Sequence, residues 1–152
     1  MLPIAIGCDD AAIEMKNQLV SYLQQKGIKV IDYSCDRQSE PTIYPDIAMQ
    51  VAQAIKAGTH ERGILICGTG IGMNITANKV PGIRAAQCHD AYSAQRARKS
   101  NDAQIISLGA RVIGLELAKT IVDNWLDSEF DGGNSAPKVD KIGYYEQQMQ
   151  RG

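Results

Sequence analysis

A cysteine stands immediately before a glycine-rich segment in the middle of the chain, in the order Cys67-Gly68-Thr69-Gly70-Ile71-Gly72. Glycines allow the backbone to approach a ligand closely, and successive backbone N–H groups before a helix form an anion site. Oriented amides also favour the thiolate form of a nearby cysteine and can hold an oxyanion. A base beside an oxyanion site suits proton abstraction next to a carbonyl. From spacing alone, Cys67 is either this base or an inert buried residue.

Cofactor and metal chemistry fit the sequence poorly. The glycines resemble a dinucleotide-binding fingerprint, but Met73 and its successors supply no third glycine, and Asp90 lies in another turn. The scattered cysteines form no CxxC pair, so we expect neither a zinc site nor a disulfide. These cysteines are Cys8, Cys35, Cys67 and Cys88. We therefore expect no cofactor and no metal.

Length and composition indicate one globular domain over residues 1–152, with 44% hydrophobic and 22% charged residues. A net charge of −1 gives no positive field for nucleic acid or a membrane surface. We expect the basic residues Arg96, Arg98 and Lys99 to form a solvated helix face. No apolar run approaches the ~20 residues of a membrane span. The N-terminus does not resemble a signal peptide, so we expect a cytoplasmic protein.

Short apolar runs alternate with amphipathic stretches along the chain. The predicted strands are Pro3–Gly7, Lys29–Tyr33, Gly63–Cys67, Arg84–Cys88 and Gln104–Leu108. The predicted helices are Ala11–Lys26, Tyr44–Ala57, Met73–Lys79, Ala91–Ser100, Gly114–Asp127 and Lys138–Gln150. This alternation predicts an α/β fold with a five-stranded parallel sheet, buried on both faces, and a C-terminal helix. The tail at 131–152 either packs on a neighbouring subunit or frays.

Open parallel sheets bind their ligands at the carboxyl ends of the strands. The predicted strands end at the segments 7–10, 67–70, 88–90 and 109–111. We therefore expect these segments to converge on one edge of the sheet. Of the two histidines, His89 should lie on this edge, whereas His60 should lie in a polar surface loop.

Ordered motifs over most of the chain match a known family. They are Gly7-Cys8-Asp9, Tyr44-Pro45, Ile64-Leu65-Ile66-Cys67-Gly68-Thr69-Gly70-Ile71-Gly72, Ala77-Asn78-Lys79, Gly82-Ile83-Arg84, Ser93-Ala94-Gln95, Asn101-Asp102, Arg111-Val112-Ile113-Gly114 and Asp131-Gly132-Gly133. From Ile4 to about Val139 the chain resembles the family of type B ribose-5-phosphate isomerase and the galactose-6-phosphate isomerase subunits. The resemblance implies a Rossmann-like three-layer sandwich. It also implies a homodimer or homotetramer whose active sites are shared between subunits.

The resemblance implies cofactor-free aldose–ketose isomerisation through an enediolate. The family base is a cysteine at the position of Cys67 or a glutamate at that of Met73, and only the cysteine is present here. Cys67 would then move a proton between the two carbons, and Asp9 would move hydroxyl protons. The other residues that the resemblance assigns to substrate are Tyr44, Gly68, Thr69, Gly70, Ile71, Gly72, Met73, Asn101 and Arg111. Of these, Thr69 and the amides from Gly70 to Met73 would hold the enediolate, and Arg111 would bind phosphate.

Four positions depart from the ribose-phosphate enzymes, which have histidines at the places of Asp10 and Ser100 and arginines at those of Asn134 and Lys138. The resemblance assigns the arginines and the first histidine to phosphate and the second histidine to ring opening. Neither asparagine nor lysine reproduces the planar fork of arginine, and Asp10 repels phosphate. Ser100 cannot titrate near neutral pH, so His89 is the candidate acid/base that replaces the ring opener.

Three functions remain open from the sequence. One is isomerisation of a sugar phosphate of the ribose 5-phosphate class. The second is isomerisation of another sugar: a tetrose phosphate, a hexose phosphate or an unphosphorylated sugar. The third is sugar binding without catalysis. A four-carbon ketose phosphate cannot cyclise, so its isomerase needs no ring opener.

Overall fold

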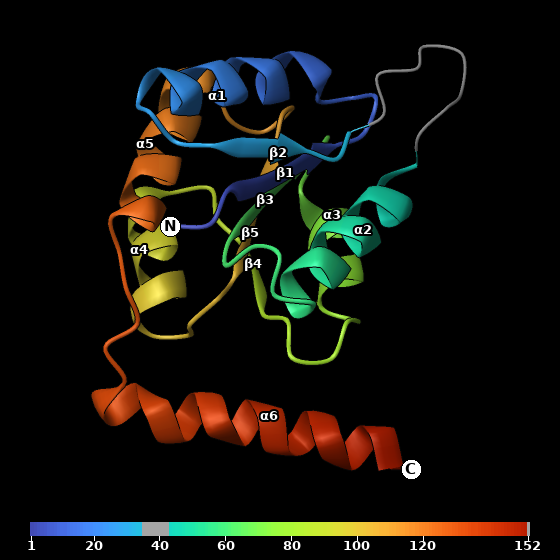
Figure 1. Ribbon diagram of the computed structural model, residues 1–152, viewed down its shortest axis with the longest axis vertical. Coiled ribbons are helices and arrows are strands. Elements are labelled where there is room, and N and C mark those ends of the chain that lie inside the picture. The colour runs from blue at the N-terminus through green and yellow to red at the C-terminus, as the bar shows by residue number, and fades with distance from the viewer. Residues whose placement is uncertain (35–42, 152) are drawn as a thin grey trace.

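The computed structural model describes residues 1–34 and 43–151. Over these residues it contains a five-stranded parallel sheet in the order β2-β1-β3-β5-β4 (Figure 1). The strands are β1 (Ile4–Cys8), β2 (Val30–Asp32), β3 (Gly63–Cys67), β4 (Ala85–Gln87) and β5 (Ile105–Gly109). The predicted α/β class, parallel sheet and C-terminal helix are confirmed, and each predicted strand lies within two residues of an observed one.

Helices cover both faces of the sheet and make three layers (Figure 1). They are α1 (Ile13–Gln25), α2 (Tyr44–Lys56), α3 (Ile71–Ala77), α4 (Ala91–Lys99), α5 (Leu115–Leu126), the short 3-10 helix η1 (Gly133–Ser135) and α6 (Ala136–Arg151). One apolar core joins the sheet to α1, α4 and α5, and the other joins it to α2 and α3. This arrangement follows from right-handed crossovers between parallel strands.

Every residue of β1, β3 and β5 is buried, as their near-continuous apolar sequences predict. By contrast, β2 and β4 are three-residue edge strands, and their residues are half-buried or exposed. The expectation of burial on both faces is therefore wrong for these two strands. An edge strand lacks a neighbour on one side, and its composition alone does not reveal that.

Two predictions of solvent exposure are wrong. His60 is only 2% exposed, because its ring lies between the Tyr33 hydroxyl and the Pro3 carbonyl oxygen, each 2.7 Å from a ring nitrogen. Arg98 is 7% exposed and donates to the carbonyl oxygen of Ala103 at 2.9 Å. A polar side chain can be buried where a backbone carbonyl satisfies it, and both of these residues use that route.

A buried arginine connects the amino edge of the sheet, where the strands begin, to the last part of the chain. Arg62, immediately before β3, is 5% exposed. Its guanidinium donates to the carbonyl oxygens of Trp125, Leu126 and Ser128 over 2.8–3.0 Å. The carbonyls at the end of a helix have no partner within the helix, so Arg62 acts as a cap for α5.

The C-terminal helix α6 stands apart from the three layers (Figure 1). None of its sixteen residues is buried. The carboxylate of Glu146 accepts a hydrogen bond from the Gly82 N–H at 2.9 Å, which ties the helix to the loop before β4.

Within the described residues, no helix combines the length and apolar character that crossing a bilayer requires. The described cysteines Cys8, Cys67 and Cys88 are buried free thiols. Cys35 lies outside the described residues.

Candidate active site

The segments that follow β1, β3 and β5 converge at the carboxyl edge of the sheet. Cys67 at the end of β3 pairs with Gly109 at the end of β5. The Asp9 N–H donates to the Ile66 carbonyl at 3.3 Å, and the Arg111 N–H donates to that of Gly68 at 3.0 Å. The structure therefore joins the predicted strand ends through their backbones.

The loop after β3 wraps around the sulfur of Cys67. The Gly70 N–H donates to Cys67 Sγ at 3.1 Å, and the Ile71 N–H donates to Thr69 Oγ1 at 3.2 Å. Two amides expected to hold an oxyanion thus have partners within the loop. Gly70 has a φ of +78°, and a Cβ there would lie 2.9 Å from the backbone of Leu108. Only glycine fits this turn.

Two further glycines of the loop bring large side chains against it. A Cβ on Gly72 would collide with the ring of Tyr44, the first residue of α2. A Cβ on Gly68 would lie 3.4 Å from the Arg111 guanidinium. The structure therefore places the side chains of Tyr44 and Arg111 beside the loop. Met73, at the position of the alternative family base, is fully buried.

A carboxyl group at the end of β1 completes this edge. Burial raises the pKa of the Asp9 carboxyl, and the neighbouring exposed Asp10 raises it further. A hydrogen bond from the Ala11 N–H at 3.1 Å and the charge of Arg111 act in the opposite direction. A carboxyl whose pKa is raised exchanges protons more readily near neutral pH, which suits it to proton transfer.

The edge strand β4 and the turn after it each contribute one residue, and sequence reasoning missed the one in the strand. Gln87 Nε2 donates to the Thr69 carbonyl oxygen at 2.8 Å. His89 Nε2 accepts a hydrogen bond from the Gly109 N–H at 2.9 Å. His89 lies on the predicted edge, whereas the contact of Gln87 links residues 18 positions apart and leaves no local signal.

Ser100 and Asn101 lie at the opposite edge of the sheet, because they precede β5. The five residues of β5 separate them from the Cys67 edge by about 13 Å at the usual rise per residue. Ser100 Oγ accepts two hydrogen bonds from the Arg96 guanidinium, at 2.7 and 2.9 Å. The exposed Asn101 borders a cavity of about 280 Å³ that Ile142 of α6 also lines.

Asn134 and Lys138 are exposed residues of η1 and α6. Their segment begins where Arg62 holds the end of α5, which is also at the amino edge. The structure therefore divides the sequence-predicted residues into two groups. The first, at the carboxyl edge, is Asp9, Asp10, Tyr44, Cys67, Gly68, Thr69, Gly70, Ile71, Gly72, Met73, His89 and Arg111. The second, which one chain does not bring to Cys67, is Ser100, Asn101, Asn134 and Lys138.

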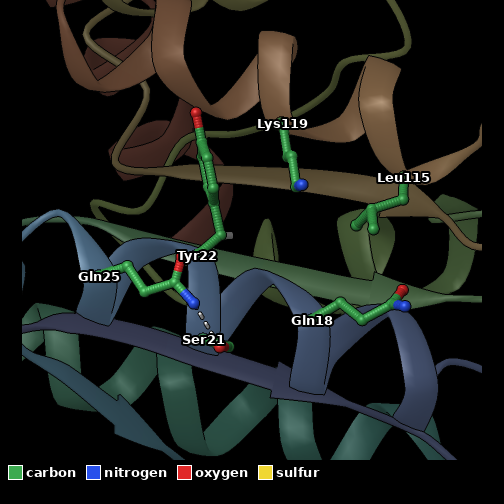
Figure 2. Close-up of a pocket in the computed structure, with 6 residues that line it drawn as sticks. All are labelled: Gln18, Ser21, Tyr22, Gln25, Leu115 and Lys119. Atoms are coloured by element: carbon green, nitrogen blue, oxygen red, sulfur yellow. Dashed lines mark hydrogen bonds between the residues drawn. The ribbon is translucent and has the colours of Figure 1, made fainter.

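Another hollow, of about 200 Å³, lies on the outer layer between α1 and α5 (Figure 2). Figure 2 shows that its lining side chains come from these two helices. They are Gln18, Ser21, Tyr22, Gln25, Leu115 and Lys119. The only charged group among them is the Lys119 ammonium, which lies 5.1 Å from the centre of the Tyr22 ring. None of these residues belongs to the carboxyl edge.

The chain is an α/β protein with a parallel sheet, and a thiol, a carboxyl and a guanidinium group lie at the carboxyl edge of that sheet. Residues 4–142 match the family model described as Ribose/Galactose Isomerase. The chain belongs to this family and is an aldose–ketose sugar-phosphate isomerase.

Named relatives cover nearly the whole chain. A D-erythrulose-4-phosphate isomerase of Pectobacterium atrosepticum is 70% identical over 97% of both chains. The ribose-5-phosphate isomerase B of Escherichia coli is 47% identical over 97% of this chain and 98% of its own. The structure of ribose-5-phosphate isomerase B from Clostridium thermocellum matches with a TM-score of 0.93 and 47% identity, over 97% of this chain and 99% of that one.

Proposed function

We propose that this protein interconverts a four-carbon ketose phosphate and its aldose, with Cys67 as the base. The observation that carries the proposal is the 3.1 Å hydrogen bond from the Gly70 N–H to Cys67 Sγ. The contact holds a backbone donor against the sulfur, which is the kind of partner that a cysteine base uses. The relative that is 70% identical, named D-erythrulose-4-phosphate isomerase, supports the four-carbon substrate.

The chemistry of a four-carbon sugar 4-phosphate agrees with the altered residues. Closure to a furanose uses the hydroxyl on the fourth carbon, and the phosphate blocks that oxygen. Such a substrate is always open, and its isomerase needs no ring-opening histidine. Ser100, where the ribose-phosphate enzymes have that histidine, is consistent with this substrate. Isomerisation of ribose 5-phosphate, another of the functions that the sequence leaves open, would require another group to open the ring.

In the proposed reaction the Cys67 thiolate removes a proton from the carbon next to the carbonyl and returns it to the neighbouring carbon. The intermediate is an enediolate. Asp9 moves the proton between the two oxygens, a role that its raised pKa suits. The amides of Gly72 and Met73 and the Thr69 hydroxyl hold the negative oxygen. The positive charge of Arg111 attracts the phosphate to the carboxyl edge of the sheet.

We also propose that the second group of residues reaches Cys67 from another copy of the chain. Asn101, Asn134 and Lys138 are exposed at the amino edge, together with α6. Large apolar side chains of α6 are exposed, including Ile142 (48%) and Tyr145 (56%). A homodimer would cover this surface and would supply Lys138 as a second cation for the phosphate.

Deuterium exchange with two open-chain ketose phosphates of different length tests the reaction. We expect the protein, in deuterium oxide, to exchange the hydrogen next to the carbonyl of erythrulose 4-phosphate faster than that of ribulose 5-phosphate. Cys67→Ala should reduce exchange by about 10²–10⁴-fold, the usual contribution of a general base. If Cys67→Ala exchanges deuterium as fast as the unchanged protein, the assignment of the base is overturned. Faster exchange with ribulose 5-phosphate would overturn the four-carbon substrate.

Complementation between two inactive variants tests the shared site. In a mixed dimer of Cys67→Ala and Asn101→Ala chains, one site carries both changes and the other carries neither. We expect co-expression of the two variants to restore activity, whereas each variant alone stays inactive. A mixed dimer without activity would show that each chain builds its own site.

A further inference from the structure

The peptide group between Thr69 and Gly70 is held on both sides. The carbonyl oxygen and the N–H of a trans peptide point in opposite directions from one rigid plane. Here the Thr69 carbonyl accepts a hydrogen bond from Gln87 Nε2 at 2.8 Å. The N–H of the same peptide, which belongs to Gly70, donates to Cys67 Sγ at 3.1 Å. One peptide plane therefore connects Gln87 to the sulfur.

The backbone of β5 packs against this plane, because Leu108 atoms lie 2.9–3.2 Å from the Cβ position of Gly70 and the Thr69 carbonyl oxygen lies 2.7 Å from that of Gly109. Gly70 has no side chain and a φ of +78°, so it adds no side-chain contact that would fix the direction of the peptide. Rotation of the plane would turn the N–H away from Cys67. The side chain of Gln87 comes from the last residue of β4, an edge strand on the other side of β5 (Figure 1). It holds the plane from outside the loop.

We propose that Gln87 is a positioning residue that keeps the Gly70 N–H on Cys67 Sγ and thereby stabilises the thiolate. The inference rests on the proposed role of Cys67 as the base. A carbonyl that accepts a hydrogen bond polarises its peptide, so the N–H of that peptide becomes a better donor. Gln87 thus acts on the sulfur through orientation and through polarisation, without touching the substrate.

Other charged or titratable groups lie at the same carboxyl edge as this thiol. They are Asp9 and Asp10 after β1, Tyr44 on α2, His89 after β4 and Arg111 after β5. Replacing Gln87 by an uncharged side chain leaves all of them in place. A change in the titration of Cys67 in such a variant is therefore assigned to the Thr69–Gly70 peptide.

Titration of the Cys67 thiolate by ultraviolet absorbance tests the inference. Each protein is measured against the same protein carrying Cys67→Ala, so that all other groups cancel. Burial raises the pKa of the Cys8 thiol and raises that of Cys88 to about 12, which keeps both protonated near neutral pH. Gln87→Met has a similar length and cannot donate. We expect its titration midpoint to rise by about one pH unit, a tenfold smaller thiolate fraction at a given pH.

Matched variants and a second readout separate positioning from general damage. Gln18→Met, in the outer hollow between α1 and α5, should leave the midpoint unchanged. Gln87→Leu should repeat the shift. Hydrogen exchange of the Gly70 amide, followed by nuclear magnetic resonance, should accelerate in both Gln87 variants. An unchanged midpoint in Gln87→Met and Gln87→Leu would overturn the inference.

The titration needs no substrate, so its outcome is independent of the proposed reaction. If the midpoint shifts but Cys67→Ala retains full isotope exchange, Gln87 orients the peptide and the proposed base is wrong. If the midpoint does not move but Cys67→Ala is inactive, the proposed reaction stands and the role of Gln87 is wrong. Where both hold, kcat of Gln87→Met should fall about tenfold with KM nearly unchanged.

Discussion

The imidazole of His89 accepts, at Nε2, a hydrogen bond from the backbone N–H of Gly109 over 2.9 Å. An acceptor nitrogen carries no proton, so this contact fixes the tautomer with its proton on Nδ1. Protonation of Nε2 would break the bond. The contact therefore favours a role in which His89 holds the end of β5 beside the Cys67 loop.

The variant His89→Gln separates this holding role from the candidate acid/base role. The glutamine side-chain oxygen can accept the same N–H but cannot titrate. We expect His89→Gln to keep its activity within about tenfold, with an unchanged pH profile, because an acid/base residue contributes about 10²–10⁴-fold. Steady-state kinetics over a pH series are the measurement. A loss of that larger size, with one limb of the profile removed, would establish acid/base catalysis by His89.

Replacing Asp9 by asparagine should increase stability and reduce activity. Because burial raises the pKa of the Asp9 carboxyl, the folded protein holds this proton more tightly than the unfolded chain. The stability linked to this group is complete below the unfolded pKa of about 4 and is lost as pH rises through the raised folded value. Asp9→Asn has no such loss and can still accept the Ala11 N–H.

Urea unfolding over a pH series measures this effect. We expect Asp9→Asn to be more stable than the unchanged protein at neutral pH, and the difference to shrink as the pH falls through the titration of Asp9. A difference that is constant with pH would show that the carboxyl charge is not its cause.

Two glycines with positive φ form a matched pair for the Cys67 loop. Gly70 (φ +78°) has no room for a Cβ, because Leu108 backbone atoms lie 2.9–3.2 Å from that position. Gly58 (φ +87°) has nothing within 4 Å of the same position. We expect Gly58→Ala to lower the free energy of unfolding by about 1–2 kcal/mol, the cost of the left-handed conformation. It should leave activity intact.

Gly70→Ala should cost more than Gly58→Ala and should also abolish activity, because the Leu108 backbone must move and the N–H leaves the sulfur. Chemical denaturation and isotope exchange on both variants test this prediction. Equal losses of stability with activity retained in both would contradict the close fit of Gly70 against β5.

Arg62→Met should be strongly destabilising. It removes the hydrogen bonds to the carbonyl oxygens of Trp125, Leu126 and Ser128, which follow or end α5. Because these carbonyls would be left unsatisfied in the interior, we expect the free energy of unfolding to fall by about 3–5 kcal/mol. Urea denaturation is the measurement. Lys119→Met, which removes an exposed pair with Glu116, is the control and should change it by less than about 0.5 kcal/mol.

Substrate preference should follow the four altered positions. A combined variant, Asp10→His, Ser100→His, Asn134→Arg and Lys138→Arg, restores the residues of the ribose-phosphate enzymes. We expect kcat/KM for ribose 5-phosphate to rise by at least tenfold, since charge-assisted hydrogen bonds contribute about 1.5–3 kcal/mol each. Activity on erythrulose 4-phosphate is the internal reference. If the ratio of kcat/KM for ribose 5-phosphate to that for erythrulose 4-phosphate is unchanged, other residues select the substrate.

The sequence predicted the parts of the fold that depend on local pattern. Apolar runs located the central strands, and the glycines after Cys67 located the loop that surrounds its sulfur. It failed where burial depends on contacts between distant residues. His60 is buried because Pro3 and Tyr33 satisfy its ring, and these partners are 57 and 27 positions away.

The candidate active site could be predicted from the sequence to a similar extent as the fold. The strand ends and the loop lie where the parallel order requires, whereas Gln87 acts across β5 on a residue far away in sequence. The separation of Ser100 and Asn101 from Cys67 also follows from strand direction. That separation could have been deduced from the predicted strand order, because residues before a parallel strand lie at the edge opposite those after it.

The helix α6 has a consequence for how the molecule unfolds. Sixteen residues without a buried side chain gain little from the rest of the chain, and a helix of that length is marginal in water by itself. If a second copy covers α6, the folding of this segment and the association of two chains share one equilibrium. The temperature of half-unfolding should then rise with protein concentration by mass action. On dilution, α6 should unfold before the sheet does.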